Sequence, residues 1–142
     1  MPVQLSLFDD ASALADLLPR VRRALNFDLG EDEAGRKKLV DHVNALSRRA
    51  DVRLTSGNTQ AVSKDTLDKW VSPGDKSHPP SVNAIVALCL AMDKYTAVKA
   101  IANACGLDVI TREESDLLEL GRICREKEEL RMRERQVKGR FR

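Results

Sequence analysis

The sequence predicts an all-α fold, in which a bundle of about five helices is followed by a long C-terminal helix. Aromatic residues make up only 4% of the 142 residues, so the core must consist of Leu, Val, Ile and Ala, which suits helices better than strands. Apolar residues recur at three- and four-residue spacing along most of the chain. Charged residues, at 32%, supply the solvated faces of such helices.

The pattern divides the chain into three parts. Residues 1–11 are apolar and then acidic, and we expect a flexible arm there. Residues 12–110 form one helical domain, and residues 111–142 form the long C-terminal helix and a basic tail. No apolar run approaches the roughly 18 residues of a membrane span, and no basic region precedes an apolar run at the start. We therefore expect a cytoplasmic bacterial protein.

The first two helices are predicted over 12–27 and 33–48. Their apolar stripes are Leu14, Leu17, Leu18, Val21 and Leu25 in the first, and Leu39, Val40, Val43 and Leu46 in the second. Pro19 interrupts the first stripe, so it either kinks this helix or opens a new one. Residues 50–62 alternate apolar and polar side chains around the turn signal Ser56-Gly57-Asn58, which fits a small hairpin or a long loop.

The remaining helices have clear start signals. Ser63 can cap a short helix over 63–71, and Ser81 can cap a fourth helix that is strongly apolar. A fifth begins near residue 95 and is ended by Gly106. We expect the fourth and fifth helices to lie in the core. Thr111-Arg112-Glu113-Glu114 is a capping box for a helix that runs to about 137.

The formal net charge of +2 conceals charges that alternate along the chain. The net charge is −4 over 1–35, +4 over 36–76, zero over 77–111, −3 over 112–130 and +5 over 131–142. The two positive zones would attract a polyanion, although they also fit ordinary solvated helix faces.

Motifs for catalysis or metal binding are not found in the sequence. His42 and His78 are isolated, and neither has a second ligand at metal-binding spacing. The three cysteines, Cys89, Cys105 and Cys124, are odd in number and widely spaced, which does not fit a set of disulfides. We therefore expect each to be a small, buried, apolar side chain in a reducing compartment. We predict no cofactor, no metal and no enzymatic activity, with a small enzyme as the remote rival.

The third helix has the pattern of a DNA-recognition helix. Val62-Ser63-x-x-x-Leu67-x-x-Trp70 offers small polar residues at the start of the helix and two apolar anchors one turn apart. This pattern resembles the helix-turn-helix domains of lambda-repressor-like regulators, and in particular small DNA-binding proteins of Mu-like prophages. The matching residues are Leu39, Val40, Val43, Val62, Ser63, Leu67, Trp70, Pro80, Ser81 and Ile85.

The resemblance implies a helix-turn-helix bundle that binds double-stranded DNA. Ser63, Lys64, Asp65 and Thr66 would approach bases or nearby phosphates, and Lys69, Arg48, Arg49, Arg53 and Lys76 would contact the backbone. Trp70 would be a core anchor. The connection before Val62 is far longer than the usual turn of about three or four residues, and it could form a β-ribbon that presents Arg53. Asp65 and Asp68 would repel phosphates, although a carboxylate can accept from cytosine N4.

Residues 4–8, Gln-Leu-Ser-Leu-Phe, resemble the pentapeptide by which bacterial proteins dock on the DNA polymerase sliding clamp. Gln4 would form hydrogen bonds, and Leu5, Leu7 and Phe8 would enter an apolar pocket. The alternative is that Leu7 and Phe8 pack on the domain.

The functional prediction is a sequence-specific DNA-binding transcriptional regulator of phage origin. We expect a homodimer through the C-terminal helix, where apolar residues recur at Leu117, Leu120, Ile123 and Leu130. The alternative is a helical adaptor between proteins, which the clamp motif could recruit to replication. A salt titration of duplex binding separates these two hypotheses.

Overall fold

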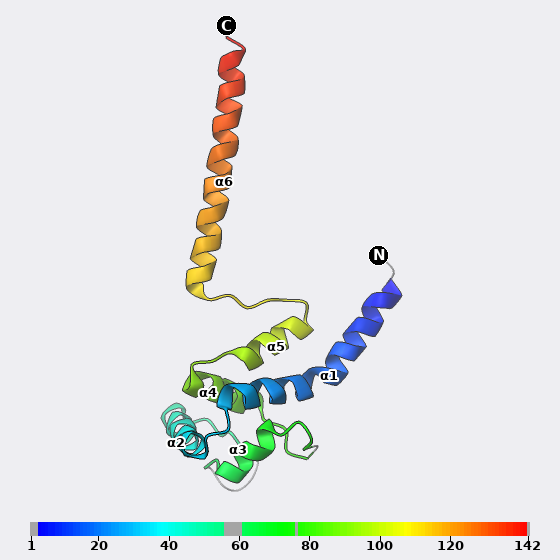
Figure 1. Cartoon of the computed structure of the whole chain (residues 1–142), viewed down its shortest axis with the longest axis vertical. Helices are drawn as coiled ribbons and strands as arrows, with labels where there is room; N and C mark the ends of the chain where they lie inside the picture. The colour runs from blue at the N-terminus through cyan, green and yellow to red at the C-terminus, as the bar shows by residue number, and fades with distance from the viewer. Residues whose placement is uncertain (1–2, 56–60, 76, 142) are drawn as a thin grey trace. The chain divides into compact units, whose positions relative to one another are not determined.

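The computed structural model describes residues 3–55, 61–75 and 77–141, with side chains from Asp10 onward. The chain forms two units, Met1–Asp108 and Val109–Arg142. The helices are α1 (Val3–Leu29), α2 (Glu33–Ala50), α3 (Lys64–Val71), α4 (Val82–Met92), α5 (Thr96–Ala104) and α6 (Arg112–Gly139) (Figure 1). The described residues contain no strand, so the all-helical fold with a long C-terminal helix is confirmed.

Helix α1 is longer than the sequence indicated. It begins at Val3 rather than near residue 12, so it includes most of the segment expected to be a flexible arm. Pro19 lies inside α1, which continues through it and is visibly bent in Figure 1. Proline has no N–H to donate and its ring crowds the preceding turn, and these two effects account for the bend.

Side-chain caps fix the starts of four helices. Ser63 and Ser81 accept hydrogen bonds from the backbone N–H groups three residues on, at 3.2 and 3.1 Å, as predicted. Thr111 and Glu114 form the predicted reciprocal capping box at the start of α6. Asp32 caps α2 by accepting from the N–H of Ala34 at 3.2 Å. These local bonds satisfy backbone donors that the helices cannot satisfy themselves.

The core of the first unit lies between α1, α2, α3 and α4, and α5 packs mainly against α1. Its buried apolar residues are Val21, Ala24, Leu25, Leu39, Val40, Val43, Leu54, Val62, Leu67, Trp70, Val71, Ala84, Ile85, Ala87, Leu88, Cys89 and Ala97. The expectation for α4 is therefore confirmed. Helix α5 contributes only Ala97 to this buried set, and Ile101 is exposed, so the core position expected for α5 is largely wrong.

The cysteines do not share one environment. Cys89 is buried on α4, as expected. Cys105 and Cys124 are exposed, so the prediction of buried thiols is wrong for these two. Cys105 is the C-cap residue that follows α5, and Cys124 lies on α6, in which no residue is buried.

The second unit consists mainly of α6, a helix of 28 residues that corresponds to a length of about 42 Å. Its apolar side chains, among them Leu120 and Leu130, are exposed. Among the described residues, no helix of either unit has both the length and the apolar character needed to cross a membrane.

Candidate nucleic-acid interface

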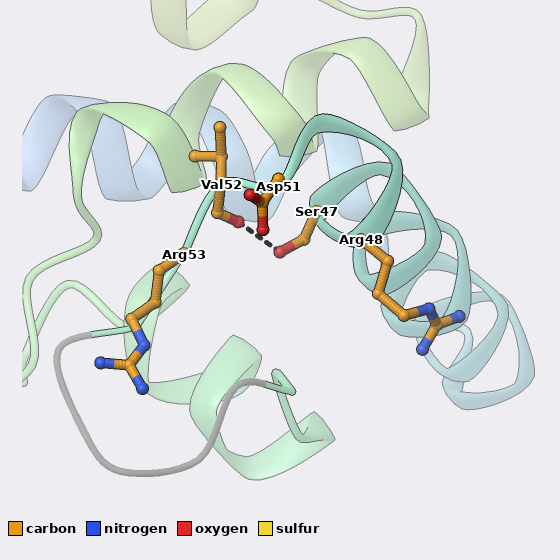
Figure 2. Close-up of a pocket in the computed structure, with 5 residues that line it drawn as sticks. All are labelled: Ser47, Arg48, Asp51, Val52 and Arg53. Atoms are coloured by element: carbon orange, nitrogen blue, oxygen red, sulfur yellow. Dashed lines mark hydrogen bonds between the residues drawn. The ribbon is translucent and has the colours of Figure 1, made fainter.

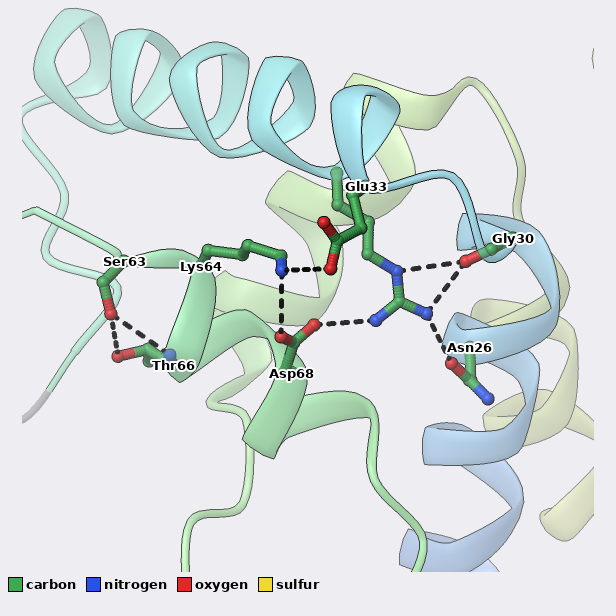
Figure 3. A network of polar contacts seen from close by, with 8 residues as sticks. Asn26, Gly30, Glu33, Ser63, Lys64, Thr66 and Asp68 are labelled. Carbon is green, nitrogen blue, oxygen red and sulfur yellow. Dashed lines mark hydrogen bonds and ion pairs between the residues drawn. The ribbon is translucent and has the colours of Figure 1, made fainter.

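Helix α3 buries one face and exposes the other. Leu67, Trp70 and Val71 are buried, and Trp70 is only 4% exposed, which confirms its predicted role as a core anchor. Ser63, Asp65 and Lys69 are exposed. The Ser63 hydroxyl is engaged with the Thr66 N–H and lies 3.0 Å from the Thr66 hydroxyl (Figure 3). Both hydroxyls therefore stabilise the first turn of α3.

A buried arginine holds the C-terminal end of α3. Arg22 on α1 is 1% exposed, and its Nη1 donates to the backbone carbonyls of Lys69 and Ser72 at 3.1 and 2.7 Å. A cation is favourable there because the carbonyl groups give a helix C-terminus partial negative charge. Sequence reasoning missed this residue. The sequence feature that could have identified it is its helical register with Leu18 and Leu25, which places this arginine on the apolar side of α1.

A side-chain amide holds the chain just before α3. Asn44 on α2 accepts from the Val62 N–H at 2.8 Å and donates from Nδ2 to the Val62 carbonyl at 2.9 Å. Val62 itself is buried, so these backbone groups have little access to water. Together with Arg22, Asn44 fixes both ends of α3 to the helices that pack against it.

Ion pairs engage Lys64, which was predicted to contact DNA, and Asp68, which was predicted to repel phosphates. Lys64 Nζ lies 3.1 Å from Glu33 Oε1 and 4.0 Å from Asp68 Oδ2. Asp68, near the centre of Figure 3, accepts from Arg36 Nη1 at 2.7 Å. Arg36 also donates to the Gly30 carbonyl at 2.8 Å. The negative charge of Asp68 is therefore offset within the protein, and Lys64 is partly committed to its own neighbours.

Three predicted phosphate contacts gather where α2 ends. Arg48 and Arg49 occupy the last turn of α2, and Arg53 follows on the connection. All three are exposed, and none forms an ion pair with a described residue. Arg48 and Arg53 line a hollow of about 200 Å³, and Figure 2 shows their guanidinium groups extending to opposite sides of it. We call Arg48, Arg49 and Arg53 the arginine cluster.

Local bonds give the floor of this hollow a fixed shape. Asp51 ends α2 in the left-handed conformation with φ 52°, and the N–H of Val52 then returns to the Ser47 carbonyl at 3.1 Å. The Ser47 hydroxyl donates to the Val52 carbonyl (Figure 2). The described residues of the connection contain no strand, and residues 56–60 lie outside the description. The described residues on both sides of this gap, Arg53 among them, lie in irregular structure, so the β-ribbon predicted to present Arg53 is not found in the described part of the connection.

An acidic depression lies beside the outer face of α3. Asp65, Asp68 and Asp75 line an open depression of about 360 Å³ together with Lys69 and Ser72. The N–H and hydroxyl of Ser77, with smaller contributions from His78, lower the pKa of Asp75 to about 2. These carboxylates would repel a polyanion from the depression. Sequence reasoning did not include Asp75, because it follows α3 on a separate loop.

Two sets of predicted residues cannot be placed. Lys76 lies outside the described residues. The side chains of Gln4, Leu5, Leu7 and Phe8 also lie outside them, although their backbone belongs to the first turns of α1. Clamp binding therefore stays a prediction. Within the described part of the chain, no group of three His, Cys, Asp or Glu side chains could hold a metal ion.

No family model, curated protein or solved structure matches the chain. The assignment of a function therefore depends on the residues and geometry given above.

Proposed function

We propose that this chain is a cytoplasmic, sequence-specific DNA-binding regulator of phage origin that acts as a homodimer through α6. The observation that carries the proposal is the arginine cluster, in which three exposed guanidinium groups have no ion-pair partner among the described residues. Cations without internal partners can neutralise phosphates at no cost in broken ion pairs. The phage origin rests on the sequence resemblance alone.

The N-terminal end of α3 is the part of the helix that would face the bases. Ser63 and Asp65 are exposed there, and the free N–H groups give the end of a helix partial positive charge. Arg36 and Lys64 offset the negative charge of Asp68. Of the two aspartates expected to repel DNA phosphates, only Asp65 therefore still does so. A carboxylate at that position can accept a hydrogen bond from cytosine N4.

Fluorescence anisotropy with a labelled duplex of random sequence tests the proposal. Lys69→Ala removes an exposed cation next to the acidic depression, and Lys64→Ala removes one at the start of α3, so both should weaken binding. Lys99→Ala, which removes an exposed cation from α5, is the matched control and should bind like the wild type. Wild-type protein that shows no affinity for any duplex at low salt would overturn the proposal.

A protein–protein adaptor is the second candidate, and one observation favours it. The acidic depression beside α3 would suit a basic protein partner better than a polyanion. The two candidates differ in their response to salt. Binding to DNA through the arginine cluster should weaken steeply as salt rises, because each neutralised phosphate releases counterions. An adaptor should show no measurable affinity for duplex DNA.

A further inference from the structure

Helix α6 bears an exposed apolar stripe. No residue of this helix is buried, although large apolar side chains recur along it. Leu120, Ile123, Leu130 and Val137 are spaced by three or seven residues, so they share one side of the helix. An exposed apolar stripe of this length marks a contact surface.

The charges of α6 are divided along its length. Residues 112–130 carry four basic and seven acidic side chains, whereas residues 131–141 carry five basic and one acidic side chain. A parallel pair would place the two acidic halves side by side and the two basic halves side by side, so that Arg133 lies beside Lys138 of the second copy and only Glu126 meets an opposite charge, on Arg131. An antiparallel pair places the acidic half of each copy beside the basic half of the other. Charge complementarity therefore selects a second copy of α6 as the occupant of the stripe.

We propose that two copies of α6 pair in antiparallel orientation, with the twofold axis between residues 128 and 129. This inference rests on the homodimer in the proposed function and adds its orientation and register. In this register Leu120 lies opposite Val137 of the second copy. Beside the stripe, Glu126 meets Arg133 and Glu119 meets Arg140 of the second copy, and symmetry repeats both pairs.

The charges single out this register from its neighbours. A shift of one heptad in one direction places Arg133 beside Arg133 of the second copy, and a shift in the other direction places Glu126 beside Glu126. Glu119, Glu126, Arg133 and Arg140 are exposed, and none of them forms an ion pair with a described residue. They are therefore available to a partner.

The two polar residues within the stripe agree with the same orientation. In a parallel pair in register, Lys127 would face Lys127 and Glu134 would face Glu134 of the second copy. In the antiparallel pair Lys127 lies against Leu130 of the second copy, and Glu134 lies against Ile123 of the second copy. The methylene groups of Lys127 and Glu134 then cover these aliphatic side chains, while the charged groups stay at the edge of the interface. Glu134 is also paired with Lys138 on its own helix at 2.8 Å.

Charge reversal tests the orientation in the full chain without DNA. Arg133→Glu should raise the dimer dissociation constant measured by sedimentation equilibrium roughly tenfold or more, since it converts two symmetric attractions into repulsions. The double variant Glu126→Arg/Arg133→Glu should restore dimerisation. Arg135→Glu makes the same charge change on the outer side of α6 and should leave the constant within about twofold.

A parallel pair gives the opposite result. There Arg133 would lie beside Lys138 of the second copy, so Arg133→Glu would tighten the dimer, and this outcome would overturn the proposal. Wild-type protein that stays monomeric at all concentrations would also overturn it, whether or not the chain binds DNA. A dimer that responds as expected would support the proposal even if the duplex experiment failed.

Disulfide cross-linking gives an independent answer in a background in which Cys105 and Cys124 are replaced by Ser. A mixture of Glu126→Cys and Arg133→Cys proteins should form a mixed disulfide if α6 pairs in antiparallel orientation. A mixture of Glu126→Cys and Arg131→Cys proteins would do so in a parallel pair. Cross-linking of the second mixture alone would overturn the proposal.

Discussion

The two hydrogen bonds between Asn44 and Val62 give a sharp test of how α3 is held. Substitution of Asn44 by Ala removes both bonds, at 2.8 and 2.9 Å, and leaves the N–H and carbonyl groups of Val62 without these partners. Val62 is only 4% exposed, so water reaches these groups poorly. We therefore expect Asn44→Ala to destabilise the first unit.

The magnitude follows from the two backbone groups. A buried polar group that loses its partner costs about 1–3 kcal/mol, and here there are two such groups in a partly buried site. Alanine recovers about 0.5 kcal/mol through its higher helix propensity on α2. The two groups together would cost about 2–6 kcal/mol if fully buried, and because the site is only partly buried the expected net loss in the free energy of unfolding lies in the lower part of that range, at roughly 2–3 kcal/mol. This is a large part of the roughly 5–15 kcal/mol typical of a domain.

Urea denaturation followed by Trp70 fluorescence measures this change, since Trp70 is the only tryptophan and is buried on α3. The midpoint should fall with little change in the slope m. Asn103→Ala makes the same substitution at an exposed position of α5 and should change the free energy by no more than about 0.5 kcal/mol. A result for Asn44→Ala as small as that of this control would refute the reasoning.

Three further expectations follow from single sites. Arg36→Ala should lower the free energy of unfolding by about 1–3 kcal/mol in the same assay, because this side chain is 15% exposed and joins the Asp68 carboxylate to the end of α1. Asp75→Asn should destabilise the protein near neutral pH. The difference from the wild type should shrink as the pH falls from about 4 toward 2 in a pH series of urea titrations, because the folded pKa of about 2 lies below the ordinary 3.8. With a chromogenic disulfide reagent, Cys105 and Cys124 should react in the native protein. Cys89 should react only as fast as the protein opens, because it is buried and burial raises its pKa.

Features encoded by short segments could be predicted from the sequence. The caps at Ser63, Ser81 and Thr111 depend on side chains within three residues of the groups they bind, so their spacing alone identifies them. The register of Trp70 with Leu67 likewise predicts a common buried face.

Features that depend on distant residues could not be predicted in this way. The contact of Arg22 with the end of α3 joins residues 47 and 50 positions apart, and the amide bonds of Asn44 join residues 18 apart. Periodicity also gives no measure of how many neighbours cover a helix. The apolar spacing of α5 therefore indicated a core helix, whereas α5 contributes only Ala97 to the buried apolar set.

The pairing of charged residues was the least predictable part of the candidate interface. Lys64 and Asp68 had opposite predicted effects on DNA binding, yet each is paired within the protein, with Glu33 and Arg36 respectively. The arginine cluster has the same residue type as Arg36 but no ion-pair partner among the described residues. Only the packing of α2 against α3 distinguishes the two cases.

The salt dependence of duplex binding tests the central claim most directly. The measurement compares the slope of log K against log salt for the wild type with that for the triple variant Arg48→Gln/Arg49→Gln/Arg53→Gln. If the arginine cluster contacts three phosphates, the slope should become shallower by about 2–3, at roughly 0.9 per contact, and the affinity at low salt should fall. Equal slopes and equal affinities for the two proteins would contradict the claim.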